Sequence, residues 1–176
     1  MDVLIVIPPT GFIDGEVTVS IEIFNESNVS FEIASTDSSY CKGESGMIVK
    51  PDKIISEVSP SHYTTILMIG GEGSKNFFWE NESILSMIKD AYSHGDIIAG
   101  MNSAVVVLAN AGILEGKKAT TSSSPDALDN LSSHGAMFVQ KPVVVDGNVI
   151  TAEGPYAILE FMVQLLDLMG VEWYSI

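Results

Sequence analysis

Apolar runs of strand length alternate along this chain with stretches of helical periodicity, and this alternation limits the possible folds. The mainly apolar runs at residues 3–7, 64–69 and 97–101 predict strands that are buried on both faces of a parallel sheet. Helical spacing is clear at residues 81–94 and 155–169. Strand, helix and strand repeated along one chain predict an α/β three-layer sandwich, with a mostly parallel sheet and helices on both faces.

The remaining elements are shorter, and one of them is ambiguous. Residues 14–27 have the length of a helix, yet the apolar positions from Val17 to Ile23 also alternate as they would in a strand. The Asp146-Gly147 pair predicts the turn of a hairpin. The other expected elements are strands at 29–34 and 118–121, helices at 105–111 and 125–132, and a short hairpin or irregular segment at 41–50.

Length and cysteine content favour one intracellular domain. The 176 residues suit a single domain over 1–176, and they bury enough surface to need no disulfide or metal for stability. Cys41 has no second cysteine to pair with. No apolar run is long enough to span a membrane, and no signal peptide is visible, so we expect a cytoplasmic protein.

The charge balance argues against nucleic acid and membrane surfaces as partners. The chain carries 23 acidic residues and 8 cationic ones, a formal net charge of −15, and every cationic residue is a lysine. Such a chain repels phosphate groups and anionic lipids. It also lacks the arginine fork that binds phosphate or carboxylate with two hydrogen bonds.

Parallel sheets place their ligands beyond the carboxyl ends of the strands. This rule directs attention to three loops that follow predicted strands, at residues 8–15, 70–74 and 102–104.

Several segments in the same order resemble the DJ-1/PfpI (ThiJ/PfpI) superfamily, whose fold is flavodoxin-like and class I glutamine amidotransferase-like. The segments are IIAGMNSAVVVLANAGILEGKKATT (97–121), VVVDGNVITAEGP (143–155), KGESGMIVKPD (42–52), ILMIGG (66–71) and Gly15-Glu16. The resemblance covers essentially the whole chain. It implies intracellular protease-like, amidase or glyoxalase chemistry, and assembly as a homodimer or higher homo-oligomer.

The resemblance also implies the positions of the site residues. The family has a catalytic cysteine at a sharp elbow between strand and helix, and Asn102 stands at that position here. Glu16 falls at the position of a buried, protonated glutamic acid, although a glutamate in a helix's first turn can also simply stabilise the helix dipole. Gly70, Gly71 and Ser103 match the loops whose backbone N–H groups hold an oxyanion or a ligand.

The two departures from the family pattern affect the chemistry most. An amide is not a nucleophile near neutral pH, so no covalent intermediate can form at Asn102. Asparagine does tolerate the positive φ that such an elbow demands, and its amide can donate to Glu16, so we expect a hydrogen-bonded Asn102–Glu16 pair. Where relatives often carry an assisting histidine, this chain has Ser122 to Ser124.

Other candidates have ordinary structural interpretations. Ser103 is expected to cap the helix after the elbow, and Cys41 to be a plain, partly exposed thiol. The three histidines lack metal-ligand spacing, so we expect no metal and no cofactor. The aromatic run Phe77 to Trp79 is expected to serve packing or a subunit contact.

Three functions remain open from the sequence. The first is a non-catalytic family member that binds a small molecule or a partner. The second is a cysteine-independent hydrolase or lyase in which Glu16 acts as acid or base and backbone N–H groups hold the oxyanion. The third is a flavodoxin-like nucleotide binder, although the chain has neither a Gly-x-Gly-x-x-Gly motif nor a P-loop.

Overall fold

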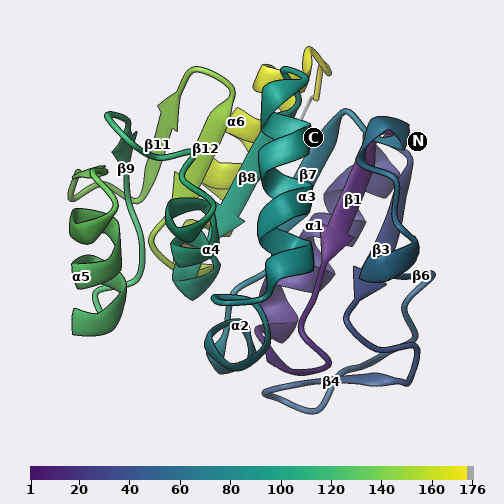
Figure 1. The fold of residues 1–176 in the computed structure, drawn as a ribbon. Helices are drawn as coiled ribbons and strands as arrows, with labels where there is room; N and C mark the ends of the chain where they lie inside the picture. The colour runs from purple at the N-terminus through teal and green to yellow at the C-terminus, as the bar shows by residue number, and fades with distance from the viewer. Residues whose placement is uncertain (174–176) are drawn as a thin grey trace.

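The computed structural model describes residues 1–173 and has a central seven-stranded sheet covered by helices on both faces (Figure 1). Every neighbouring pair of strands is parallel except β11 with β12. The prediction of a mostly parallel α/β three-layer sandwich is therefore confirmed. The strands, in spatial order, are β11 (Val143–Asp146), β12 (Val149–Ala152), β8 (Ile97–Met101), β7 (Thr65–Met68), β1 (Val3–Val6), β3 (Phe31–Ser35) and β6 (Lys53–Ile54).

The two faces of the sheet pack against different helices. One face packs against α3 (Glu82–Ser93), α4 (Val105–Asn110) and α5 (Pro125–Ser133), and the other against α1 (Asp14–Glu26) and α6 (Ile158–Met169). The pleat of β1 sends Leu4 and Val6 to the first face and Val3 and Ile5 to the second. A strand covered on both sides must be apolar throughout, which explains the continuous hydrophobic runs of the sequence.

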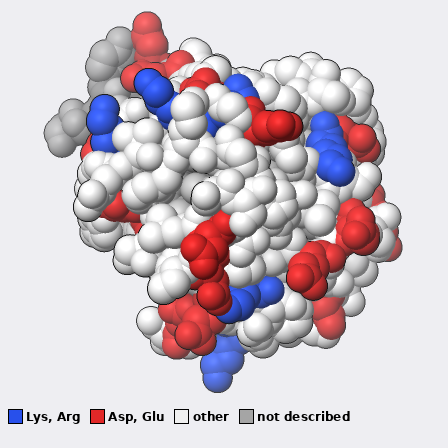
Figure 2. Space-filling model, turned by 60° about the vertical axis from the view of Figure 1, so that its left-hand side comes forward, with Lys and Arg blue, Asp and Glu red and all other residues white. Residues whose placement is uncertain are grey.

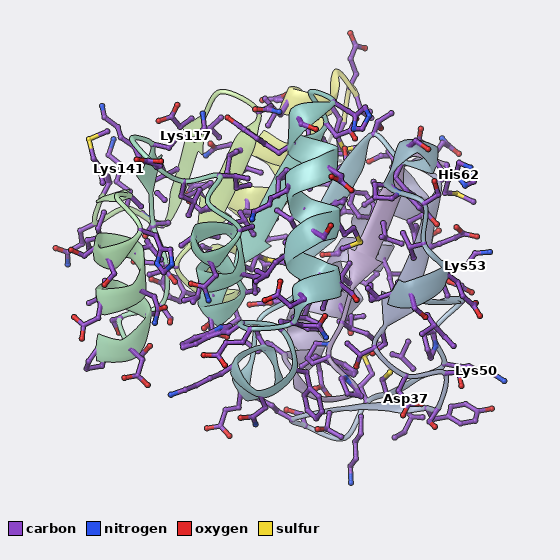
Figure 3. The ribbon with its side chains drawn as sticks, in the orientation of Figure 1. Asp37, Lys50, Lys53, His62, Lys117 and Lys141 are labelled. Carbon is purple, nitrogen blue, oxygen red and sulfur yellow. The ribbon has the colours of Figure 1, made fainter. Side chains whose placement is uncertain are left out.

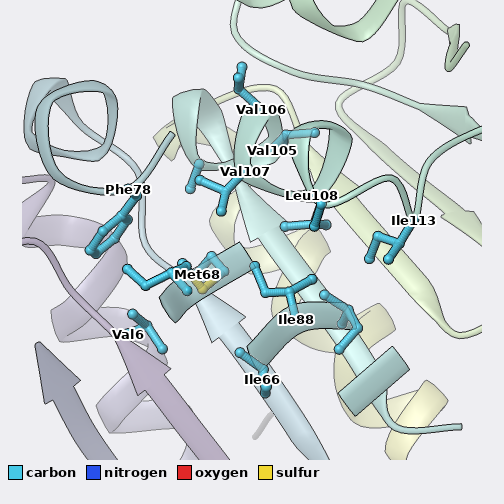
Figure 4. Packing of buried hydrophobic residues seen from close by; sticks show 14 of the residues in the cluster. Val6, Ile66, Met68, Phe78, Ile88, Val105, Val106, Val107, Leu108 and Ile113 are labelled. Carbon is cyan, nitrogen blue, oxygen red and sulfur yellow. The ribbon is translucent and has the colours of Figure 1, made fainter. Parts of the chain in front are cut away.

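Side chains from separate segments interlock on the first face (Figure 4). Met68 of β7 lies in one cluster with Phe78, Ile88 of α3 and Leu108 of α4, and all four are fully buried. Each such side chain contributes roughly 1.5–3 kcal/mol when it leaves water. This cluster holds α4, and with it the start of α4, against the sheet.

The ambiguous segment 14–27 is helical. Its buried residues Glu16, Val17, Ser20, Ile23 and Phe24 follow the spacing of one helix face. The alternating valines and isoleucines are β-branched, but packing against the sheet and against α6 overrides that local preference.

Several short elements do not follow from the sequence pattern. The segment at 41–50 is an antiparallel hairpin whose first strand also pairs with β2, and α2 follows the Gly-Gly loop. The predicted helix at 155–169 starts with a 3-10 turn before α6. These elements are β2 (Thr10–Phe12), β4 (Cys41–Gly43), β5 (Ile48–Val49), α2 (Glu72–Phe77), β9 (Lys118–Ala119), β10 (Met137–Phe138), and the 3-10 turns η1 (Ile55–Glu57), η2 (Pro60–His62), η3 (Asn102–Ala104) and η4 (Pro155–Ala157).

The chain changes direction across the sheet between β1 and β7. Strand β1 leads to β3 on one side of it, whereas β7 leads to β8 on the other side. The carboxyl ends of β1, β7 and β8 therefore border the crevice where parallel sheets bind ligands. Within residues 1–173, no helix is both long and apolar enough to cross a membrane.

Candidate functional site

Asn102 forms the elbow between β8 and the 3-10 turn that leads into α4. Its φ of 54° lies in the left-handed region, which asparagine tolerates better than most residues other than glycine. The side-chain Oδ1 accepts a hydrogen bond of 2.7 Å from the backbone N–H of Ser103. The backbone oxygen of Asn102 accepts one of 2.9 Å from the hydroxyl of Thr121. Hydrogen bonds thus hold both the side chain and the backbone oxygen of Asn102.

Glu16, in the first turn of α1, is fully buried. Its Oε2 accepts a hydrogen bond of 2.8 Å from the backbone N–H of Gly70, while its Oε1 has no hydrogen-bond partner. Burial raises the pKa of this carboxyl from 4.5 to about 8, against the opposing effect of the Gly70 N–H, and the charge of Glu44 raises it further. The carboxyl is therefore protonated at neutral pH, and a surface role in the helix dipole is excluded.

Asn102 and Glu16 both flank Gly70. A Cβ atom built on Gly70 would lie 2.6 Å from the Cβ of Asn102 and 3.3 Å from Oε2 of Glu16. The expected hydrogen bond from the Asn102 amide to Glu16 is nevertheless absent. Oδ1 of Asn102 and Oε2 of Glu16 each accept from a backbone N–H group instead, and Oε1 of Glu16 has no partner. The expectation of a hydrogen-bonded Asn102–Glu16 pair is therefore wrong. The backbone N–H groups are the nearer partners of both.

The Gly-Gly loop has no room for side chains. A Cβ on Gly70 would also lie 2.6 Å from the backbone oxygen of Met101. Gly71 has a φ of 120°, and a Cβ there would lie 2.2 Å from the backbone oxygen of Gly11. Both glycines are thus required for the close approach of the loops after β1, β7 and β8.

Ser103 bonds to this glycine loop and not to its own helix. Its Oγ donates to the backbone oxygen of Gly71 at 2.7 Å and accepts from the Gly71 N–H at 3.2 Å. No side chain caps α4. The prediction that Ser103 caps the helix is therefore wrong, since the elbow brings its hydroxyl within reach of both the N–H and the carbonyl oxygen of Gly71.

A cleft of about 500 Å³ opens beside the elbow. One wall is Trp79, whose Nε1 donates to the backbone oxygen of Ser103 at 2.9 Å. The hydroxyls of the loop before α5 face it from the other side. The lining consists of Ile13, Glu44, Gly71, Glu72, Lys75, Trp79, Asn102, Ser103, Ser122, Ser123, Ser124 and Asp126. Glu16 is 0% exposed and lies outside this lining, so a ligand in the cleft meets Asn102 first.

Acidic side chains dominate the charge around the cleft. Three carboxylates line it, those of Glu44, Glu72 and Asp126, against the single lysine Lys75. Lys75 is ion-paired with Asp126, and Oε1 of Glu44 accepts a hydrogen bond of 3.0 Å from the Glu72 N–H. Acidic side chains also outnumber lysines over the face of the molecule in Figure 2. The cleft therefore carries a negative potential, in keeping with the charge of the whole chain.

Most of the charged residues that line the cleft were not predicted from the sequence. Lys75, Glu72 and Trp79 come from α2 and the turn after it, a segment too short to show helical periodicity. Phe78 of the same aromatic run is fully buried, so packing is confirmed for it, while Trp79 also lines the cleft. The sequence signal nearest to these residues was the Gly-Gly pair, because it follows a predicted strand and ligands bind beyond the carboxyl ends of parallel strands.

The remaining sequence candidates lie outside the cleft. Cys41 is fully buried, which corrects the expectation of a partly exposed thiol, and burial raises its pKa. His62 lies beside β3 and β6, away from α2 and α5 (Figure 3). His94 and His134 end α3 and α5. Among residues 1–173, no group of three or more histidine, cysteine or acidic side chains is placed to hold a metal ion.

Comparisons with known proteins agree with this fold. The DJ-1/PfpI family profile matches residues 1–168. An uncharacterized protein of Methanocaldococcus jannaschii is 38% identical over 153 residues, covering 87% of this chain and 75% of that protein. A deglycase of Pyrococcus horikoshii is 27% identical, covering 90% and 93% of the two chains.

Solved structures show the same architecture. The crystal structure of a ThiJ/PfpI domain protein from Brachyspira murdochii superposes with a TM-score of 0.91 at 27% identity, covering 96% of each chain. Drosophila melanogaster DJ-1beta superposes with a TM-score of 0.84 at 24% identity, covering 97% of this chain and 92% of that one. At this identity the similarity shows the fold alone. With a family profile matched from residue 1 to 168 and this architecture, the chain belongs to the DJ-1/PfpI family.

Proposed function

We propose that this protein is a non-catalytic member of the DJ-1/PfpI family that binds a small molecule in the cleft beside Asn102. The family resemblance assigns the catalytic cysteine to the position of Asn102, and an amide side chain cannot attack a carbonyl group near neutral pH. Cys41, the single cysteine of the chain, is fully buried in the hairpin strand β4. A covalent mechanism therefore has no nucleophile at the elbow.

One observation carries this proposal beyond the missing cysteine. Each backbone N–H group assigned to an oxyanion site is already bound within the protein. The Gly70 N–H donates to Glu16, the Gly71 N–H to Ser103, and the Ser103 N–H to the side chain of Asn102. An oxyanion that formed in the cleft would find no free backbone donor among these three, and such donors usually supply the largest share of catalysis in acyl transfer.

An enzymatic alternative rests on Glu16. A carboxyl with a pKa of about 8 is poised to give or take a proton near neutral pH, and the relatives include proteins named deglycases. A cysteine-independent hydrolase or lyase would use this group. Its full burial behind Gly70 weighs against that role, because a proton must pass between it and a ligand that contacts only the cleft lining.

Methylglyoxal consumption by the purified protein separates the two functions. We expect the wild type to show no turnover above the protein-free background, and Asn102→Cys to gain turnover because the elbow then holds a nucleophile and the Ser103 N–H becomes free. Wild-type turnover that disappears in Glu16→Gln, while Glu22→Gln on the exposed face of α1 retains it, would establish the enzyme and overturn the proposal.

A further inference from the structure

The charged side chains that line the cleft are mainly hydrogen-bond acceptors, three carboxylates against one lysine. Two of the cleft's backbone N–H groups, those of Gly71 and Ser103, are used within the protein. Oε1 of Glu44 accepts from the Glu72 N–H, but among residues 1–173 neither the second oxygen of Glu44 nor the carboxylate of Glu72 forms a salt bridge. A ligand oxygen anion would thus meet carboxylates where it needs donors, whereas a ligand that donates hydrogen bonds would meet acceptors.

The cleft already holds one ammonium group of the protein itself. The Nζ of Lys75 lies 5.4 Å from the centroid of the Trp79 ring and pairs with the carboxylate of Asp126. Aromatic faces attract ammonium ions, and a neighbouring carboxylate adds to the attraction. The Trp79 ring is held in place by its hydrogen bond to Ser103, so this face is a fixed feature of the cleft. The wall therefore has the chemistry of a cation site.

Lys75 does not fill the cleft. Its side chain is 54% exposed, and about 500 Å³ remains between α2, the elbow and the loop before α5. A space of that size accommodates a small organic molecule. Glu72 lies on the same helix as Lys75, about one turn earlier. Its free carboxylate is a counter-charge for an ammonium group of a ligand, in addition to the ammonium of Lys75.

We propose that this cleft binds a small molecule bearing primary ammonium groups, and that it discriminates against carboxylates and phosphates. The inference rests on the proposed function, since it names the ligand class of the same cleft. It reverses the preference expected of an oxyanion site, because the backbone donors of that site are occupied and three carboxylates against one lysine make up the charged part of the lining.

Isothermal titration with four molecules of one chain length tests the ligand class. The probes are 1,5-diaminopentane, 5-amino-1-pentanol, 1,5-pentanediol and glutarate at pH 7. We expect the diamine to bind most tightly, the amino alcohol at least fivefold more weakly, and the diol and glutarate not to bind measurably. A diamine no tighter than the diol would overturn the proposal. This readout is independent of methylglyoxal turnover, so each proposal can fail alone.

Two variants separate the cleft from the general negative charge of the protein. Glu72→Gln removes a cleft carboxylate, and Glu22→Gln removes an exposed carboxylate of α1. Both change the net charge equally. We expect Glu72→Gln to weaken diamine binding at least fivefold and Glu22→Gln to leave it within twofold of the wild type. Equal weakening in both variants would show that the diamine is held only by the overall charge, and the proposal would fall.

Discussion

The hydroxyl of Ser103 and the peptide of Gly71 exchange two hydrogen bonds, of 2.7 Å from Oγ to the carbonyl oxygen and 3.2 Å from the N–H to Oγ. One small side chain thereby satisfies both polar groups of a glycine that stands at a φ of 120°. Ser103, in the elbow after β8, thus fixes the backbone orientation of Gly71, in the loop after β7.

Removing this hydroxyl should loosen the glycine loop. Ser103→Ala leaves the Gly71 N–H without its partner, and such a loss destabilises by about 1–3 kcal/mol. The Gly71 oxygen loses one donor but keeps the Ser74 N–H at 3.1 Å. Urea unfolding measures the change, and amide hydrogen exchange at Gly71 should become faster. Ser123→Ala is the matched control, because the side chain of that exposed serine forms no hydrogen bond within residues 1–173. Equal unfolding midpoints for the two variants would contradict the structural role of Ser103.

The left-handed backbone of Asn102 predicts an unusual order of substitution effects. Both Asn102→Gly and Asn102→Ala lose the bond to the Ser103 N–H, but only alanine resists positive φ, so Asn102→Ala should be less stable than Asn102→Gly by about 1–2 kcal/mol. Asn28, at the end of α1, has the same φ of 54° and supplies a matched control. Thermal unfolding should show a larger loss of stability for Asn102→Ala than for Asn28→Ala, because only Asn102→Ala also loses the hydrogen bond to the Ser103 N–H. A smaller effect at Asn102 than at Asn28 would argue against that bond.

A methyl group on Gly70 should disturb the site directly. The added Cβ of Gly70→Ala would lie 2.6 Å from both the Asn102 Cβ and the Met101 oxygen, so neighbouring backbone must move. Overpacking of this kind destabilises by about 1–3 kcal/mol. Gly15→Ala, whose Cβ meets nothing within 4 Å, should be neutral or slightly stabilising. Chemical denaturation of both variants checks the contrast, and comparable stabilities would refute the close approach.

Glu16 predicts a specific pH dependence of stability. Its pKa is about 8 in the folded protein against 4.5 for an ordinary glutamate, so between these values the folded state carries the extra proton. Stability from this group is fully present below pH 4.5 and is lost as the pH rises through 8, with a change on the order of a few kcal/mol. Glu16→Gln should remove this decline, because the amide does not titrate.

The measurement is the free energy of unfolding at pH 5, 6, 7, 8 and 9. The difference between wild type and Glu16→Gln isolates the group from other titrating residues, and Glu22→Gln on the same helix should follow the wild type. A wild-type curve parallel to that of Glu16→Gln would mean that the carboxyl is already ionised at pH 5.

The fold can be predicted from the hydrophobic patterns of the sequence, whereas the details of the site depend on short polar contacts. The buried run at 97–101 and the glycines at 70–71 suffice to place the elbow and the loop beside it. The partners of Asn102 and Glu16 do not follow from the sequence, because the placement of the Asn102 amide relative to Glu16 depends on angles that only the folded elbow fixes. The contribution of Glu72 and Lys75 on α2 to the cleft does not follow from the sequence either, since a six-residue helix leaves no periodic signal.

Helix α4 is buried on nearly every side, with Val105 to Ala109 all at 0% exposure. A helix enclosed in this way cannot slide or turn without opening voids, so the elbow at its start stays still while a ligand arrives. The rate of binding is then limited only by diffusional encounter and by rearrangement of the exposed Lys75 side chain, which takes picoseconds to nanoseconds. Association should therefore follow a single exponential whose rate rises linearly with ligand concentration.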